Sequence, residues 1–195
     1  LAVYRPSDNT WYVRNPHGPE VLIQPFGGYG DIPAPGDYDG DGLFDFAIYR
    51  PRGNSWQVLT HFGSVLTTSF GGYGDIPAPD DYDGDGFTDV ATFRPSDWTW
   101  HVWLSSTGGF LHEQWGMAGD IRLSADLDGN PGVDFVVYRP SDNTWYVKST
   151  DPAGPAPFWF VWGMSGVPVP GFWACWVGDT PAFFQPTSHA WTVLN

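Results

Sequence analysis

The sequence predicts an all-β fold, a β-propeller of four-stranded blades, and three observations lead to this prediction. The opening pattern LAVYRPSDNTWYV recurs as FAIYRPRGNSWQV, VATFRPSDWTWHV, FVVYRPSDNTWYV and PAFFQPTSHAWTV. Its prolines stand at positions 6, 51, 95, 140 and 186, so the spacings are 45, 44, 45 and 46 residues. The 195 residues include 25 Gly, 19 Pro, 12 Trp, 9 Tyr and 14 Phe, which favour turns and strands over helices. A period near 45 with strand-like content is typical of propellers.

Each repeat unit divides into four expected strands. In the second unit these cover residues 32–39, 45–50, 55–60 and 65–70. Pro-Ser-Asp-Asn between the second and third strands is turn chemistry, because Pro fixes φ and Asp and Asn bond their own backbone. Four strands make one blade.

We expect a single propeller domain over residues 1–195, with units at about 1–31, 32–75, 76–120, 121–166 and 167–195. The chain opens at the second strand of a unit and stops after the third strand of the fifth, which gives eighteen strands. Five blades with incomplete terminal blades is the simplest interpretation. A piece of a longer ring is the alternative.

Clustered aspartates mark the loop between the first and second strands of a unit. In the second unit, Asp37, Asp39, Asp41 and Asp45 lie within nine residues, with two glycines among them. Carboxylates this close repel one another unless a cation binds them, and oxygen ligands at alternate positions suit Ca²⁺. The Leu43 carbonyl would add a backbone ligand.

The acidic spacing returns twice in the following units. The expected ligands there are Asp81, Asp83, Asp85, Phe87 through its carbonyl, and Asp89, then Asp126, Asp128, Asn130, Gly132 and Asp134. The third copy is weakened because Asn130 replaces an acid and Pro131 a glycine. In the fourth copy Phe172, Ala174, Trp176 and Thr180 occupy these positions and hold no cation. We therefore expect two strong calcium sites and one weaker site; the alternative is three solvated acidic turns.

The charge balance excludes some partners. With a net charge of -14 and only 8 Lys and Arg, the chain is a poor match for nucleic-acid phosphates. Residues 152–178 carry no charge, but their prolines and glycines disfavour a membrane-spanning helix. Cys175 is the only cysteine, so no disulfide can form within the chain.

The stretch FGGYGDIPAPG, followed by DYDGDGLFD and FAIYRP, resembles the FG-GAP or VCBS-type repeat. The resemblance covers essentially the whole chain. It implies a β-propeller that binds calcium in the loop between the first two strands of a blade, as in integrin α heads and several bacterial and fungal lectins. By this resemblance the aspartates of the first two loops are metal ligands. The motif indicates fold and metal and leaves function open.

Tryptophan follows two patterns. One Trp recurs in each unit, at positions 11, 56, 100, 145 and 191, and we expect these to pack within the blades. The stretch 158–176 is aromatic outside this register and has lost the acidic ligands. It is either an interface or a last blade with a thicker core. The candidate interface residues are Phe158, Trp159, Trp162, Phe172, Trp173 and Trp176.

Two other residue types recur less informatively. Arginine occupies positions 5, 50, 94 and 139, with Gln185 in the last unit, and we expect it to stack on an aromatic ring or to bond to a carbonyl or carboxylate. The five histidines share no metal-binding spacing, so surface or turn positions are expected for them.

These observations favour a non-enzymatic, calcium-stabilised binding or assembly module that is secreted, extracellular or periplasmic, because weak calcium loops need abundant calcium. It would bind a protein partner, act in adhesion, or form a homo-oligomer or larger assembly. One alternative is a lectin with aromatic pockets between blades. Another is the accessory domain of a secreted polysaccharide-active enzyme. Outside the loops no recurring pair of carboxylates suggests glycoside hydrolysis.

Overall fold

The computed structural model describes residues 2–14, 21–163, 166–171 and 179–194. Eighteen strands form there and no helix, as the repeat predicts. None of the described residues therefore belongs to a helix long and apolar enough to cross a membrane. The strands are β1 (Ala2–Arg5), β2 (Thr10–Arg14), β3 (Val21–Pro25), β4 (Ile32–Pro33), β5 (Phe46–Arg50), β6 (Ser55–Leu59), β7 (Val65–Ser69), β8 (Ile76–Pro77), β9 (Val90–Arg94), β10 (Thr99–Trp103), β11 (Phe110–Gln114), β12 (Ile121–Ala125), β13 (Asp134–Arg139), β14 (Thr144–Lys148), β15 (Phe158–Val161), β16 (Val167–Pro168), β17 (Ala182–Gln185) and β18 (Ala190–Val193).

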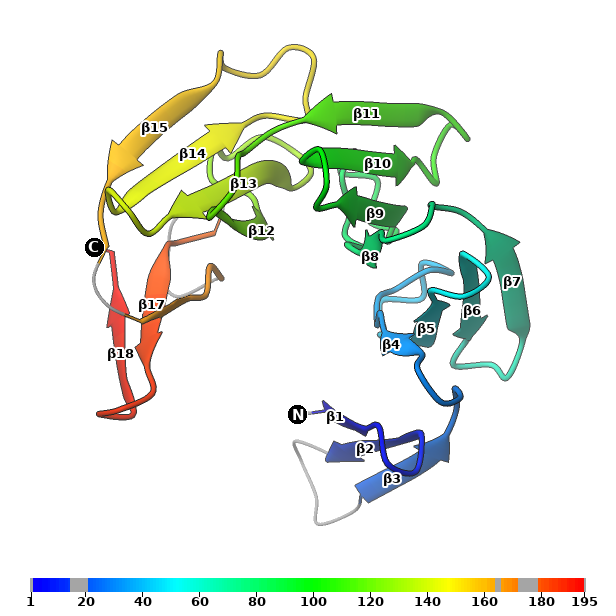
Figure 1. The fold of residues 1–195 in the computed structure, drawn as a ribbon. Coiled ribbons are helices and arrows are strands. Elements are labelled where there is room, and N and C mark those ends of the chain that lie inside the picture. The colour runs from blue at the N-terminus through cyan, green and yellow to red at the C-terminus, as the bar shows by residue number, and fades with distance from the viewer. Residues whose placement is uncertain (1, 15–20, 164–165, 172–178, 195) are drawn as a thin grey trace.

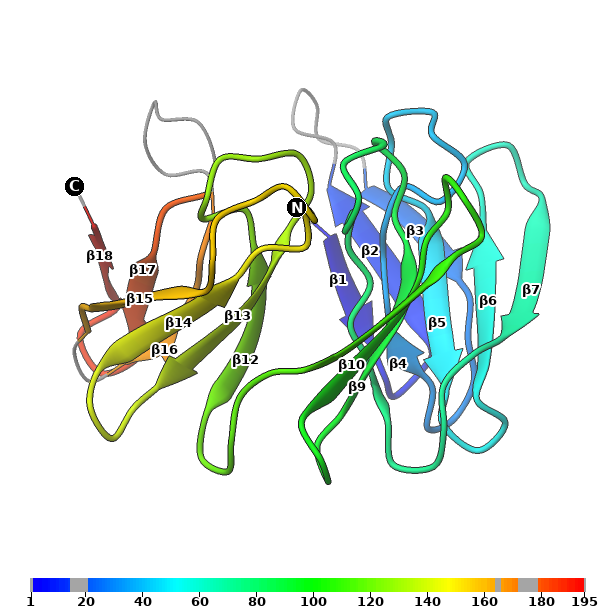
Figure 2. The ribbon, with the colours of Figure 1, turned by 90° about the horizontal axis from the view of Figure 1, so that it is seen from above.

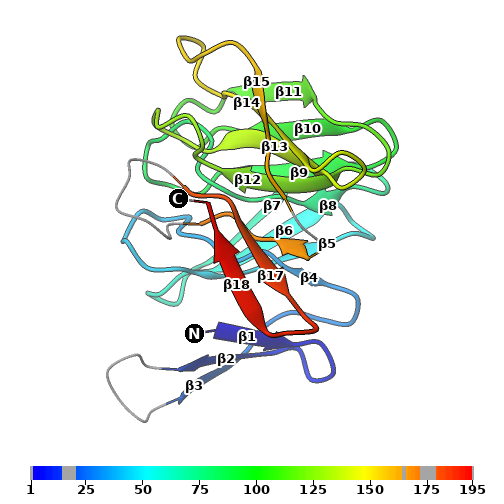
Figure 3. The same cartoon turned by 90° about the vertical axis from the view of Figure 1, so that its left-hand side faces the viewer.

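The strands form five antiparallel sheets, which we number in chain order. Sheet 1 is β1–β3, sheet 2 is β4–β7, sheet 3 is β8–β11, sheet 4 is β12–β15 and sheet 5 is β16–β18. The five sheets stand around a common centre, with β4, β8 and β12 innermost and β7, β11 and β15 outermost (Figure 1). Sheets 1 and 5 have three strands each and stand at the two ends of the array (Figure 1). Sheet 5 lies nearest the viewer when the array is seen from its left-hand side (Figure 3). The fold is thus a five-bladed propeller with incomplete terminal blades, as predicted.

The first strand of each unit is shorter than the sequence pattern suggests. We predicted residues 32–39 as a strand, but β4 covers only Ile32–Pro33, followed by an isolated bridge between Gly36 and Asp45. Pro33 and Pro35 lack the N–H that a continuous ladder requires, which explains the interruption. The other three strands of this unit end within one residue of the predicted bounds.

The core lies between neighbouring sheets and is centred on the recurring tryptophan. Trp56, Trp100 and Trp145 are completely buried and Trp11 is 3% exposed, which confirms their expected packing role. The expectation is wrong for Trp191, which is 49% exposed because no further sheet covers it in the last unit. In sheet 3, Trp100 contacts Phe93 on the adjacent strand and Phe135 of sheet 4. Because the first four of these rings contact residues of their own sheet and the next, one residue type joins successive blades from sheet 1 to sheet 5.

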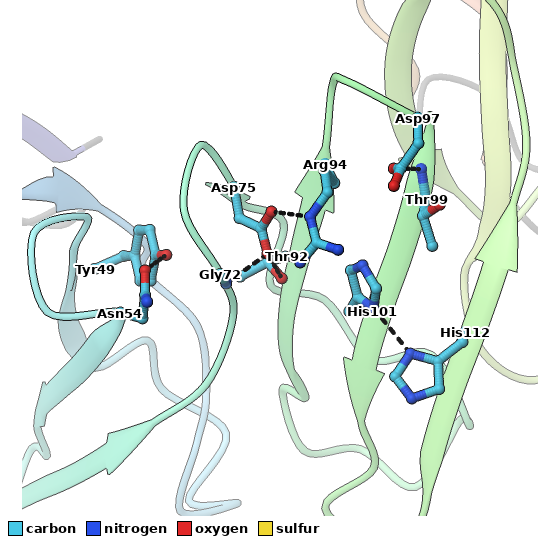
Figure 4. Close-up of polar contacts among 10 residues, drawn as sticks. All are labelled: Tyr49, Asn54, Gly72, Asp75, Thr92, Arg94, Asp97, Thr99, His101 and His112. Atoms are coloured by element: carbon cyan, nitrogen blue, oxygen red, sulfur yellow. Dashed lines mark hydrogen bonds and ion pairs between the residues drawn. The ribbon is translucent and has the colours of Figure 1, made fainter.

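A buried ion pair also links successive units. The Arg94 guanidinium donates two hydrogen bonds to the Asp75 carboxylate, Nε to Oδ1 at 2.7 Å and Nη2 to Oδ2 at 3.1 Å (Figure 4). The Asp75 side chain is 0% exposed. The same paired geometry joins Arg50 to Asp31 and Arg139 to Asp120. Each aspartate ends one unit and each arginine lies in the next, so the predicted carboxylate partner of the recurring arginine is confirmed in these three cases.

Candidate metal centre

Three acidic loops connect the first and second strands of sheets 2, 3 and 4. We name them loop 1 (residues 37–45), loop 2 (residues 81–89) and loop 3 (residues 126–134). All three lie at the same end of the array, at the top of Figure 2. In each loop three carboxylates come together, with one oxygen from each within 4.8 Å of the others. The groups are Asp37, Asp39 and Asp41; Asp81, Asp83 and Asp85; and Asp126, Asp128 and Asp134.

The backbone of loop 1 turns around its own carboxylates. The two oxygens of Asp37 accept hydrogen bonds from the Gly40 and Gly42 N–H groups at 2.7 and 2.8 Å. Asp41 Oδ1 accepts from the Leu43 N–H at 2.8 Å. Both glycines have positive φ, 76° and 81°, which side chains disfavour. The Asp-Gly alternation therefore produces a loop that holds its acidic side chains in one place.

Each loop keeps one buried carboxylate oxygen that receives no hydrogen bond. These atoms are Asp41 Oδ2, Asp83 Oδ1 and Asp128 Oδ2. A buried acceptor without a donor is costly, and a carboxylate more so, unless a cation takes the place of the donor. The donor set consists of oxygens from three clustered carboxylates, the ligand type that Ca²⁺ prefers. The residues therefore fit a hard divalent cation in all three loops.

The aspartate at the ninth position of each loop lies deeper than the others. Asp45, Asp89 and Asp134 are at most 1% exposed. Asp45 accepts hydrogen bonds from the Tyr38 and His61 N–H groups, and Asp89 accepts from those of Tyr82 and Ser105. Asp45 and Asp89 thus anchor their loops to the sheet, whereas Asp134 joins the carboxylate group of loop 3.

Burial also changes the acidity of these carboxyls. It raises the pKa of Asp89 to about 6 and that of Asp134 to about 7, because removal from water disfavours the charged form. A bound divalent ion would act in the opposite direction and keep both groups ionised.

The remaining predicted ligands differ in what the structure shows for them. The Leu43 and Phe87 carbonyls stay predictions. The Asn130 N–H donates to Asp128 Oδ1 at 2.8 Å. Gly132 serves close packing, because a Cβ placed there would lie 2.6 Å from the Tyr82 carbonyl oxygen of loop 2. A Cβ placed at Gly84 of loop 2 would lie 2.5 Å from the Pro131 side chain of loop 3. Loops 2 and 3 are therefore in direct contact.

Sequence reasoning missed that successive loops bond to one another. The N–H at the eighth position donates to the carbonyl of the first aspartate in the preceding loop. These bonds are Thr88 to Asp37 at 2.6 Å, Val133 to Asp81 at 2.8 Å and Asp179 to Asp126 at 2.5 Å. The residues at the eighth position are Thr, Val and Asp, which carry no shared polar signal, so only the structure identifies these bonds. The result is a row of three linked loops, with loop 3 joined in turn to Asp179.

Serines of sheet 3 form a second contact that the sequence did not indicate. Ser105 Oγ donates to Asp85 Oδ2 at 2.8 Å, and Ser106 Oγ donates to Asp83. Both lie in the turn between β10 and β11, twenty or more residues after the aspartates they contact. Loop 2 is therefore supported from its own sheet as well as from loop 3.

The comparisons with known proteins support the fold. No family model matches the chain, and no curated protein does. A solved structure titled "Streptogramin B lyase structure" matches with a TM-score of 0.56 and 10% sequence identity over 95% of this chain and 61% of that chain. The shared fold is a propeller. At 10% identity the likeness shows the fold alone, and the FG-GAP resemblance is not matched by a family model. The chain spans 61% of the length of that relative.

The predicted aromatic interface is only partly described. Phe172, Trp173 and Trp176 lie outside the described residues. Phe158 and Trp162 are half-buried and pack against the core cluster around Phe183 and Trp145. Trp159 is 66% exposed and stands opposite Tyr146 on the neighbouring strand. Among the described residues of this stretch, Trp159 therefore offers the accessible aromatic surface.

Proposed function

We propose that this chain is a non-enzymatic, calcium-stabilised binding module that works outside the cytoplasm. The observation that carries the proposal is the buried oxygen without a donor in each acidic loop, at Asp41, Asp83 and Asp128. Three clustered carboxylates repel one another, and a divalent ion would replace that repulsion with attraction. A secreted or periplasmic location would supply the calcium that such loops require.

The linked loops explain how calcium would stabilise the whole propeller. Loop 1 bonds to loop 2 through Thr88, and loop 2 bonds to loop 3 through Val133. An ion that fixes one loop therefore also fixes the backbone of its neighbour. In this proposal calcium holds adjacent sheets in place, and binding of a partner takes place on the surface that the sheets present.

Calorimetric titration of the metal-free chain with Ca²⁺ tests the stabilising role, together with melting curves at millimolar calcium and in excess chelator. We expect saturable binding and a higher melting temperature with calcium. Replacement of the exposed Asp97 by Asn is the matched control, since it removes an acid outside the loops and should leave both measurements unchanged. Identical melting curves with and without chelator would contradict the proposal.

A carbohydrate ligand is a second candidate, favoured by one pocket. Gln114, Trp115, Gly116, Val137, Arg139 and Tyr146 line a pocket of about 320 Å³ between sheets 3 and 4. The Arg139 guanidinium lies 4.2 Å over the Tyr146 ring. The exposed Trp159 of β15 stands opposite Tyr146 of β14 and extends this aromatic surface. Such surfaces suit the apolar faces of sugar rings.

Glycan-array binding separates the two kinds of partner. Loss of a glycan signal in Trp159→Ala but not in Phe62→Ala, which removes an aromatic ring that is 78% exposed elsewhere, would support the carbohydrate site. A stable complex with a protein and no glycan signal would support the protein-binding module. Hydrolase or lyase activity of the chain by itself would overturn the non-enzymatic assignment.

A further inference from the structure

Two histidines that lie eleven residues apart in the sequence meet in sheet 3. His101 on β10 and His112 on β11 are directly opposite each other in the strand register, in a row with Thr92 of β9. Their Nδ1 atoms share a hydrogen bond of 2.8 Å, in which one ring donates and the other accepts (Figure 4). Both histidines border one pocket with Arg94 and with Ser69 of β7, so the pair lies on the face of sheet 3 turned toward sheet 2 (Figure 4).

We propose that this pair, through both Nδ1 atoms, is a binding site for a divalent transition metal of the Cu²⁺ or Ni²⁺ type. Imidazole nitrogens lie about 2.0–2.1 Å from such metals. Two nitrogens 2.8 Å apart then form an angle of about 86° at the metal. This is close to the right angle between neighbouring ligands in square-planar or tetragonal Cu²⁺ and Ni²⁺ sites. Tetrahedral Zn²⁺ would need the nitrogens to be about 3.3 Å apart.

In the metal-free chain the two Nδ1 atoms share one proton, which a bound metal would displace. His101 Nε2 is buried, so the ligand atom on that ring is Nδ1, which faces His112. Arg94 borders the same pocket as the pair. The charge of Arg94 is itself compensated by Asp75, with which it forms two hydrogen bonds.

Space for further ligands lies next to the pair. A pocket of about 340 Å³ is bordered by both histidines and by Ser69, Phe70, Gly71 and Arg94. Water molecules or an anionic ligand in this pocket would complete the coordination of the metal. His112 is exposed to solvent, so an ion can reach the site from outside.

The pair is specific to sheet 3 and is no general part of the repeat. Sheet 2 has Gln57 opposite Thr67 at these positions, and sheet 4 has Tyr146 opposite Trp159. The packing of the blades therefore does not require histidine here. The site also differs chemically from the acidic loops, because nitrogen ligands do not suit Ca²⁺.

Titration of the full chain with Cu²⁺ in saturating calcium tests this proposal by calorimetry and electron paramagnetic resonance. We expect one equivalent bound at the pair, with a tetragonal spectrum and coupling to two nitrogens. His101→Gln and His112→Gln, which introduce the residue type present at Gln57, should each abolish this binding. His61→Gln is the matched control and should leave it unchanged.

Calcium-dependent melting of each variant confirms that it folds. If the wild-type chain binds no Cu²⁺, or if His112→Gln retains the same stoichiometry and spectrum, the proposal is wrong. A wild-type spectrum with one coupled nitrogen would also overturn it, since the site requires both rings.

Discussion

The ion pair between Arg94 and Asp75 gives the most direct test of how the units hold together. The Asp75 side chain is 0% exposed, whereas Arg94 keeps 31% of its side chain exposed. Arg94→Met therefore leaves a buried carboxylate with only the Gly72 N–H and the Thr92 hydroxyl as donors. We expect a loss of about 3 kcal/mol, the lower end for breaking a buried ion pair because Arg94 is partly solvated.

The reverse substitution should cost less. In Asp75→Asn the amide oxygen can still accept from Gly72, and the Arg94 guanidinium can turn to water, so we expect about 1 kcal/mol. In a chain of this length, a loss of about 3 kcal/mol lowers the melting temperature by roughly 6–12 °C. Arg52→Met, at an exposed position in the turn between β5 and β6, is the control and should change little.

Urea unfolding at pH 7 in saturating calcium measures both losses on one scale. Arg94→Met should cost more than Asp75→Asn because Asp75 is fully buried and Arg94 is not. If Asp75→Asn destabilised the chain as much as Arg94→Met, or more, the cost would not come from an uncompensated buried carboxylate, and the argument would fail.

Three further predictions concern pH, metal and packing. Hydrogen bonds, mainly from Arg94, outweigh the raising effect of burial and lower the pKa of Asp75 below its ordinary value of 3.8. The stability gap between wild type and Asp75→Asn should therefore be constant above about pH 5 and shrink as the pH falls below 3.8, in urea unfolding from pH 7 to pH 3. Asp39→Ala should reduce the calcium-induced rise in melting temperature more than Asp128→Ala, because loop 3 has Asn130 in place of an acid; equal reductions would contradict the ranking of the loops. Gly84→Ala should lower the free energy of unfolding by about 1–3 kcal/mol more than Gly86→Ala, since both have positive φ but only a Cβ at position 84 meets loop 3; equal losses would show that the loops do not press on each other.

The repeat made most of the fold predictable. The regular spacing of Pro6 and its counterparts sets the units, and within a unit the turn residues separate the strands, so eighteen strands could be counted from the sequence. The acidic clusters were equally readable, because most of their members lie two residues apart and a tight loop must bring them together; Asp134 lies six residues after Asp128 and is the exception. In both cases the residues that come together are close in the sequence, so their spacing is enough to predict the contact.

What the sequence did not reveal depends on register between segments. His101 and His112 have no metal-binding spacing, and they meet only because the hairpin of β10 and β11 aligns them. The bond between Thr88 and the Asp37 carbonyl joins backbone atoms of two units, and backbone atoms carry no side-chain signal. Asp45 could be assigned to the loop but not to its inward position, because burial depends on the neighbouring strands.

The split of each ion pair across a unit boundary limits how such a protein can gain or lose repeats. Insertion of one whole unit supplies a new aspartate and a new arginine together, so every guanidinium still finds its counter-charge. Insertion of a partial segment would leave one of them alone inside the protein. At the boundary before the last unit, Val167 follows a glycine at the position where Asp120 follows one at the end of the third unit. Gln185 of the last unit stands at the position of the recurring arginine. Both members of this ion pair are therefore absent together. Duplication by whole units is thus the route that preserves the charge balance of the interior.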